Sequence, residues 1–206
     1  TIPDGFTGIG YAFKECESLV SLKITNSVTT IITSFEGCKN LQRLEIPNSV
    51  TKMWLGNQVF KSCYNLVSVE NIPNGVETIG IEAFRYCSNL VSLQIPDSVN
   101  NIKTRAFANC SKLNNINIPN GVGFIDIDTF RGCQSLNSIE LPNSIYTIGD
   151  SAFRESGLKN LTIPNSVTDI GIAAFKDCKK LNSITIPNSV MNIGEGAFDG
   201  CGELTV

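Results

Sequence analysis

A single unit of about 23 residues is repeated along the entire 206-residue chain, and this repeat constrains the fold more than any other feature of the sequence. The unit reads approximately I-P-N-S-V-x-x-I-G-x-x-A-F-x-x-C-x-x-L-x-S-I-x, and nine copies follow one another at steps of 22 to 26 residues. The phase of the copies is marked by Phe13, Phe35, Phe60, Phe84, Phe107, Phe130, Phe153, Phe175 and Phe198. A unit this short cannot bury its own apolar positions, so neighbouring units must stack to form one continuous core.

Each part of the unit predicts a different local structure. The stretch L-x-S-I-x-I alternates apolar and polar residues and is rich in β-branched side chains, which indicates a strand. The following P-N-S or P-N-G predicts a turn, and V-x-x-I-G predicts a second short extended segment. The spacing of A-F-x-x-C-x-x-L predicts a short helical or 3₁₀ corner. The expected fold is therefore a right-handed α/β solenoid of about nine coils, roughly 40 Å long at the spacing of adjacent strands.

The composition excludes several classes of function. Hydrophobic residues make up 42% of the chain, which is too many for a disordered protein. No apolar run is long enough to span a membrane, and no stretch at the amino terminus has the pattern of a signal peptide. The net charge of −3 disfavours a nucleic-acid partner. The sequence contains no histidine, the most common general base and metal ligand, so we expect a non-enzymatic protein without cofactor or metal.

The repeat also resembles a known family. Its pattern at Ile163–Leu181 and at Ile186–Leu204 is similar, almost residue for residue, to the BspA-like leucine-rich repeats of bacterial surface proteins. The resemblance extends over the whole chain and implies a secreted or surface-anchored adhesion and interaction module of bacteria or protists. Local departures are Thr25 in place of proline, Ile32 in place of glycine, Ser156 in place of cysteine, and an insertion within Met53–Gln58.

Eight cysteines occupy one position of the repeat. A metal site is disfavoured because each coil supplies a single thiol to the column instead of four around one point. Disulfides between adjacent coils would bring Cα atoms to a permitted separation, but parallel Cβ atoms about 4.8 Å apart exceed the usual 3.8 Å. The remaining interpretation is a buried ladder of free thiols, and Ser156 favours it because a hydroxyl can pack there but cannot form a bridge. The expected ladder consists of Cys16, Cys38, Cys63, Cys87, Cys110, Cys133, Cys178 and Cys201.

Two columns of polar residues flank the buried position of each predicted strand. They can be read as a solvated sheet face or as a hydrogen-bonding surface for a protein or glycan, as repeat solenoids present to their ligands. The first column consists of Ser21, Arg43, Ser68, Ser92, Asn115, Ser138, Asn160 and Ser183. The second consists of Lys23, Glu45, Glu70, Gln94, Asn117, Glu140, Thr162 and Thr185.

Aromatic and basic residues provide two further candidate surfaces. Trp54, Phe124 and Tyr146 occupy positions expected to face solvent, where they either anchor a partner or fold over a neighbouring coil. A cation follows most of the repeated phenylalanines and predicts a basic line that either meets acidic glycans or serves as a solubilising edge beside nearby carboxylates. This line comprises Lys14, Lys61, Arg85, Arg131, Arg154 and Lys176, with Lys179 and Lys180 nearby.

We therefore expect an extracellular or cell-surface binding or adhesion module whose ligand is a protein or a glycan. The alternative is a structural spacer without a ligand of its own. Residues 1–206 are expected to form one leucine-rich repeat domain. Neither end of the sequence carries an atypical capping repeat, which predicts an excerpt of a longer array and possible end-to-end self-association.

Overall fold

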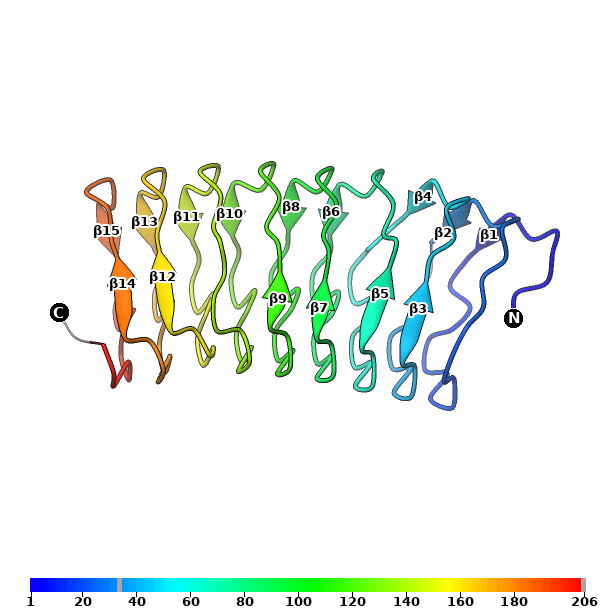
Figure 1. Cartoon of the computed structure of the whole chain (residues 1–206), viewed down its shortest axis with the longest axis horizontal. Helices are drawn as coiled ribbons and strands as arrows, with labels where there is room; N and C mark the ends of the chain where they lie inside the picture. Colours follow the sequence, from blue (N-terminus) through cyan, green and yellow to red (C-terminus); the bar gives the residue numbers. More distant parts are fainter. Residues whose placement is uncertain (33–34, 205–206) are drawn as a thin grey trace.

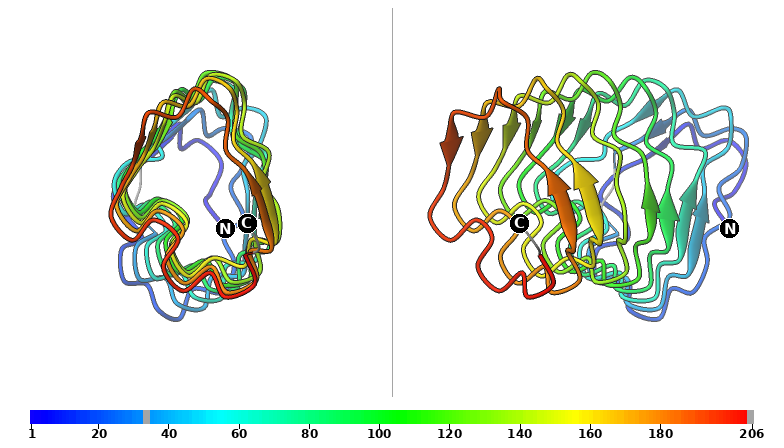
Figure 2. Two further views of the ribbon diagram at one scale, coloured as in Figure 1. Left: turned by 90° about the vertical axis from the view of Figure 1, so that its left-hand side faces the viewer. Right: turned by 60° about the vertical axis from the view of Figure 1, so that its left-hand side comes forward.

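The computed structural model describes residues 1–32 and 35–204 as a rod of stacked coils (Figure 1). The two termini lie at opposite ends of the rod (Figure 1). Viewed along its length, each coil passes once around a closed cross-section with strands on two sides (Figure 2). These stacked coils confirm the expected solenoid. Each repeat buries its apolar side against the next repeat.

The strands that L-x-S-I-x-I predicts form one side of the rod, which we call the strand face. Its pairs are parallel and align equivalent residues of successive coils, such as Leu44 with Val69 and Leu161 with Ile184. The strands are β3 (Arg43–Glu45), β5 (Ser68–Glu70), β7 (Ser92–Leu93), β9 (Asn115–Ile116), β12 (Asn160–Thr162) and β14 (Ser183–Thr185).

The extended segment V-x-x-I-G forms short strands on the other side, which we call the back face. Pairing is again parallel, with Ile148 aligned to both Ile125 and Ile170. The strands are β1 (Gly8–Ile9), β2 (Thr30–Ile31), β4 (Lys52–Met53), β6 (Thr78–Ile79), β8 (Asn101–Ile102), β10 (Phe124–Ile125), β11 (Thr147–Ile148), β13 (Asp169–Ile170) and β15 (Asn192–Ile193).

The core consists of ladders in which one repeat position stacks on itself. The phenylalanine rings of successive coils are stacked with centroids 5.1 to 5.5 Å apart. From Phe35 to Phe175 these rings are fully buried, whereas Phe13 and Phe198 at the two ends are only partly buried. Leucine, isoleucine and valine positions form further ladders around the rings. The core is therefore continuous along the rod.

The corner differs from expectation, because the described residues contain neither an α-helix nor a 3₁₀-helix. Consecutive turns replace it: the Cys87 N–H donates to the Phe84 carbonyl, and the Leu90 N–H donates to the Cys87 carbonyl. Residues with positive φ, including Glu82 at 57° and Tyr86 at 66°, interrupt any helical path. The α/β prediction is therefore wrong for the described chain, whose regular elements are all strands, while the right-handed winding of the coils stays a prediction.

Hydrogen bonding between coils explains why turns replace the helix. The N–H groups of Glu82, Phe84 and Tyr86 donate to carbonyls of the next coil, and those between them donate within their own coil. A helix would satisfy every amide after its first turn internally and leave fewer of them for the neighbouring coil. The i, i+3 spacing of the sequence fits both arrangements, so periodicity alone could not distinguish them.

Coil three, which starts at Ile46, departs from the regular repeat on both faces. In coil three, the inserted Trp54 and Leu55 shift the back-face pairing, so that Met53 aligns with Ile31 while Leu55 aligns with Ile79. The same coil carries an additional residue on the opposite side, Asn71, with φ 61°. The strand-face sheet is interrupted there, since β5 pairs with β3 and β7 pairs with β9.

Candidate functional site

The strand face carries polar side chains along most of the rod. Alternation places Leu44 in the core and turns Arg43 and Glu45 outward, and the other coils follow the same rule. Of the sixteen polar residues predicted for this face, all are exposed except Ser68 and Asn117, which are half-buried. The structure therefore brings both predicted columns together on one side of the rod.

Two hollows on this face lie on either side of the extra residue Asn71. The larger has a volume of about 820 Å³ and is lined by Lys23, Arg43, Glu45 and Asn71, among others. The smaller, of about 470 Å³, also includes Asn71, together with Ser68, Glu70, Ser92 and Gln94. The two predicted columns do not include Asn71, although the 26-residue step from Ile46 to Ile72 is a signal of additional residues.

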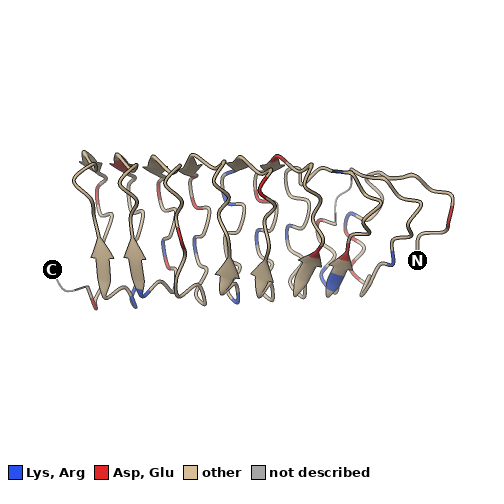
Figure 3. Cartoon of the chain, turned by 45° about the horizontal axis from the view of Figure 1, so that its top comes forward, with Lys and Arg blue, Asp and Glu red and all other residues tan. Residues whose placement is uncertain are grey.

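Charge is distributed unevenly along the strand face. Charged residues gather at β3 and β5, where Glu45 and Glu70 are register partners and Arg43 lies on the same strand as Glu45 (Figure 3). From Ser92 to Thr185 the two columns carry only one charged side chain, Glu140. A third hollow of about 440 Å³ lies beside Glu140, Asn160 and Thr162. The face thus offers a charged end and a long neutral stretch.

Some of these polar side chains are engaged within the protein. The Asn117 side-chain amide donates to the Ile95 carbonyl at 2.8 Å and accepts from the Ile95 N–H at 2.7 Å. The side chain thus makes the two hydrogen bonds to Ile95 that the backbone of a neighbouring strand would otherwise make. The Ser183 hydroxyl donates to Asn160 Oδ1 at 2.7 Å. Asn117 therefore has a structural role, and we expect its neighbours to contribute more to any ligand contact.

The candidate aromatic anchors lie on a different surface from the polar columns. Trp54 follows β4 on the back face and is 60% exposed, and Tyr146 precedes β11 and is 52% exposed. Phe124 in β10 is half-buried beneath Tyr146, with ring centroids 6.3 Å apart, and Lys103 lies 5.8 Å from its ring. Trp54 is separated from the Phe124–Tyr146 pair by β6 and β8, so the three residues do not form one cluster.

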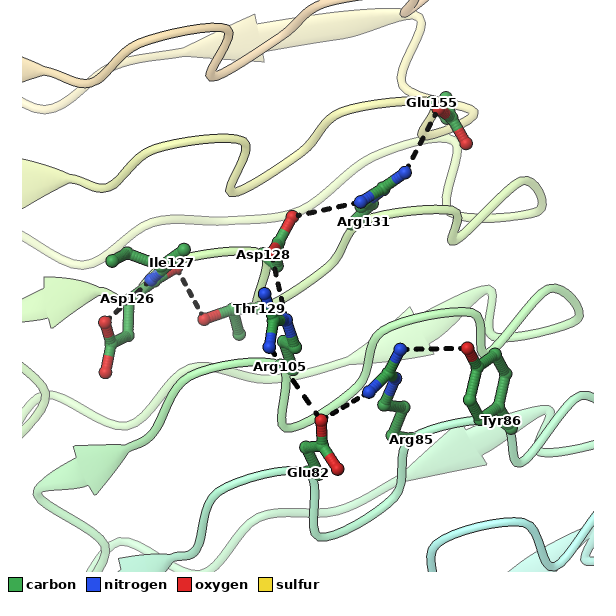
Figure 4. Close-up of polar contacts among 10 residues, drawn as sticks. All are labelled: Glu82, Arg85, Tyr86, Arg105, Asp126, Ile127, Asp128, Thr129, Arg131 and Glu155. Carbon is green, nitrogen blue, oxygen red and sulfur yellow. Dashed lines mark hydrogen bonds and ion pairs between the residues drawn. The ribbon is translucent and has the colours of Figure 1, made fainter.

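The predicted basic line is instead a ladder of alternating charges along the corner (Figure 4). Glu82, only 7% exposed, is the centre of the ladder and pairs with Lys61 at 2.7 Å and with Arg85. Burial alone would raise the pKa of Glu82, but hydrogen bonds from Lys61, Arg85 and Gln58 together lower it. Further pairs are Lys14–Glu36, Arg105–Asp128, Arg131–Glu155, Arg154–Glu155 and Lys176–Asp199. All six cations of the predicted line are therefore paired with carboxylates, whereas neither Lys179 nor Lys180 has an ion-pair partner among the described residues.

All eight cysteines are free thiols arranged in one column. Six are buried, and Cys16 and Cys201 at the ends are half-buried. From Cys38 onward each thiol donates to the carbonyl of the phenylalanine one coil earlier, at 2.9 to 3.3 Å. Burial raises the pKa of Cys38 to about 11 and that of Cys133 to about 12. Such thiols are poor nucleophiles, and the described residues contain no cluster of three or more potential metal-ligating side chains.

Thiol counting tests this arrangement. In the native protein at pH 8 we expect no more than two thiols, those of Cys16 and Cys201, to react with a disulfide reagent, because burial keeps the other six protonated and inaccessible. After denaturation without reductant, all eight should react. A smaller number after denaturation would reveal disulfide bridges and contradict the free ladder.

Stacked coils of one repeated unit, with parallel strands and a continuous apolar core, define this protein as a leucine-rich repeat solenoid. The sequence profile of the BspA type leucine rich repeat region, six copies long, matches residues 1–114, 54–180 and 100–206. The chain therefore belongs to the BspA type leucine-rich repeat family.

Solved structures of bacterial proteins share this fold. The chain is similar to a leucine-rich repeat protein from Bacteroides ovatus, with 28% identity over 97% of this chain and 69% of that one, and a TM-score of 0.67. It is also similar to a leucine rich cell surface protein from Faecalibacterium prausnitzii, with 33% identity over 85% of this chain and 48% of that one, and a TM-score of 0.68. A leucine-rich repeat protein of T. pallidum is similar with 28% identity over 90% of this chain and 81% of that one, and a TM-score of 0.69.

No curated protein matches the sequence. None of the described segments forms a helix of the length and hydrophobicity required to cross a bilayer.

Proposed function

We propose that this protein is a non-enzymatic binding or adhesion module that acts outside the cell or on its surface and recognises a protein or a glycan through the strand face. The observation that carries the proposal is the exposure of nearly every polar side chain of this face, with two hollows meeting at Asn71. Hydroxyl, amide and carboxylate groups at regular spacing can donate and accept hydrogen bonds along an extended ligand.

Two further observations support this assignment. The similar protein from Faecalibacterium prausnitzii is a leucine rich cell surface protein, which favours a bacterial surface location for this chain as well. Burial raises the pKa values of the six buried thiols, and the sequence has no histidine that could activate them, so the arrangement favours binding over catalysis.

A binding panel tests the proposal. Extracellular-matrix proteins and neutral or sulfated glycans would be presented to the protein at low and high salt. The double substitution of Arg43→Ala and Glu45→Ala should weaken binding about tenfold if the charged hollow contacts the ligand. The matched control is Lys52→Ala with Glu77→Ala, which also removes one exposed charge of each sign but lies on the back face. Equal binding by both variants would contradict a role for the charged end of the strand face.

A structural spacer is the second candidate, and the unbroken phenylalanine ladder between opposite termini favours it. A rod with one continuous core holds its two ends at a fixed separation without needing a ligand. Absence of binding throughout the panel, with the fold intact by circular dichroism, would leave the spacer as the better assignment.

A further inference from the structure

Gly123 determines how the exposed ring of Tyr146 lies on the back face. The two residues immediately precede the paired strands β10 and β11 (Figure 1), and the Tyr146 N–H donates to the Gly123 carbonyl at 2.8 Å. A Cβ atom on Gly123 would lie only 2.7 Å from Tyr146 Cε1, because the ring leans over the glycine. Glu77 and Asn100 hold the equivalent positions of the two preceding coils. The glycine therefore makes space for the tyrosine ring, and Tyr146 remains 52% exposed.

The half-buried Phe124 ring extends this aromatic surface. Its centroid lies 6.3 Å from that of Tyr146, and the planes of the two rings are tilted by 56°. The Lys103 ammonium group lies 5.8 Å from the centroid of the Phe124 ring. The two rings thus form an apolar patch that a ligand can reach from solvent.

The surroundings of the aromatic pair are polar. The pair occupies the two positions that precede the buried isoleucine of each back-face strand. In the same coils and in those on either side, every other residue at these positions is polar, apart from Gly123; these residues are Asn100, Asn101, Thr147, Thr168 and Asp169. The anchors of a protein interface usually lie among well-packed contacts that exclude water. An isolated aromatic pair among amides and hydroxyls instead favours a ligand that is itself mostly polar and has one apolar face.

Polar groups on both sides of the pair are held by hydrogen bonds. On the β8 side, Lys103 donates to Asn101 Oδ1 at 3.4 Å. On the β13 side, the Asp169 carboxylate accepts from the Thr168 hydroxyl at 2.5 Å and from the Asn192 amide at 2.7 Å. These two hydrogen bonds lower the pKa of Asp169, so its carboxylate is ionised at neutral pH. The pair is therefore flanked by donors on one side and by an acceptor on the other.

We propose that Phe124 and Tyr146 bind a neutral glycan by stacking against one of its pyranose rings. A pyranose combines an apolar face of C–H groups with hydroxyls around its edge, and aromatic rings flanked by amide and carboxylate groups complement both parts. A cation and a carboxylate flank the pair, so neither sign of ligand charge is favoured. The site lies on the back face and does not depend on the ligand of the strand face.

Disaccharide titration monitored by nuclear magnetic resonance provides the test. The probes are lactose, cellobiose, maltose and mannobiose, with N-acetylneuraminic acid as a charged sugar. At least one disaccharide is expected to bind with a Kd of about 1 mM and to shift the amides of Gly123 and Tyr146, whereas the charged sugar should bind about tenfold more weakly. The proposal fails if no disaccharide shifts these amides, or if the charged sugar binds more tightly.

Three variants link binding to the aromatic pair. Tyr146→Ala should weaken binding about tenfold, because it removes the stacking ring. Gly123→Asn introduces the residue type of the equivalent Asn100 and displaces the tyrosine ring, so binding should be lost while thermal stability is retained. The control is Tyr64→Ala, which removes a 41% exposed tyrosine from the corner and should leave the Kd unchanged. Unaltered binding by Tyr146→Ala would contradict the proposal.

Competition distinguishes a glycan from a polypeptide ligand. A matrix glycoprotein that binds the wild type but not Tyr146→Ala should be released by the disaccharide that binds. Enzymatic removal of its glycans should abolish its binding. A glycoprotein that still binds after deglycosylation, and whose binding still requires Tyr146, would identify a polypeptide ligand and overturn the glycan assignment.

Discussion

Replacement of Phe107 by alanine is expected to lower the free energy of unfolding by about 3 to 5 kcal/mol. The Phe107 ring is fully buried and stacks on both Phe84 and Phe130, with centroids 5.3 and 5.5 Å away. Its removal would leave a cavity in the middle of the ladder, where the rings above and below cannot close the gap because their own coils are hydrogen-bonded in register. Urea unfolding followed by circular dichroism would measure the loss.

The matched control removes aromatic rings that lie outside the core. Phe124→Ala with Tyr146→Ala deletes two rings from the back face, where Tyr146 is 52% exposed. We expect this double variant to change stability by less than about 1 kcal/mol. A loss of unfolding free energy comparable to that of Phe107→Ala would show that Phe124 and Tyr146 are packing residues and would contradict their role as surface anchors.

The second large effect is expected at Glu82. Glu82→Gln should lower the free energy of unfolding at pH 7 by about 3 kcal/mol, because it leaves the cations of Lys61 and Arg85 beside a buried neutral amide. The substitution preserves size and shape, so the loss would report the charge instead of the packing. Urea unfolding of both proteins at several pH values would measure it. Glu155→Gln is the control, since the Glu155 side chain is 40% exposed and its loss should cost much less.

The pH dependence of this difference has a defined direction. The pKa of Glu82 is lowered in the folded protein, so its carboxylate contributes stability above the pKa of the unfolded chain, near 4.5. That contribution is lost as the pH falls through the lower folded pKa. The stability difference between the wild type and Glu82→Gln should therefore be full at pH 7 and shrink in acid. A difference that stays constant down to pH 2 would mean that the charge of Glu82 is not its cause.

The ladders of the core could be predicted from the sequence, because each ladder consists of the same repeat position in successive coils. Phe35, Phe60 and Phe84 recur in phase, so stacking was the only way to bury them. The conformation of the corner could not be predicted in the same way. Whether Tyr86 donates within its own coil or to the next is decided by contact with another repeat, and a local pattern does not record that contact.

The candidate site could be predicted only in its outline. The alternating pattern correctly predicted that Arg43 and Glu45 face outward, because successive side chains of a strand point to opposite faces regardless of their neighbours. The partners of individual side chains depend on register: Asn117 satisfies Ile95 across the sheet, and Glu82 collects cations from three coils. The irregular position Asn71 was visible as a change in repeat length, but only the stacked coils reveal the two hollows beside it.

The placement of the two termini at opposite ends of the rod has a mechanical consequence. Tension applied between the termini pulls on the end coils, and each coil is bonded only to its neighbours, so coils would detach one after another. A detached repeat of about 23 residues releases roughly 70 Å of extended chain. Under load, the rod would thus lengthen in steps of nearly equal size.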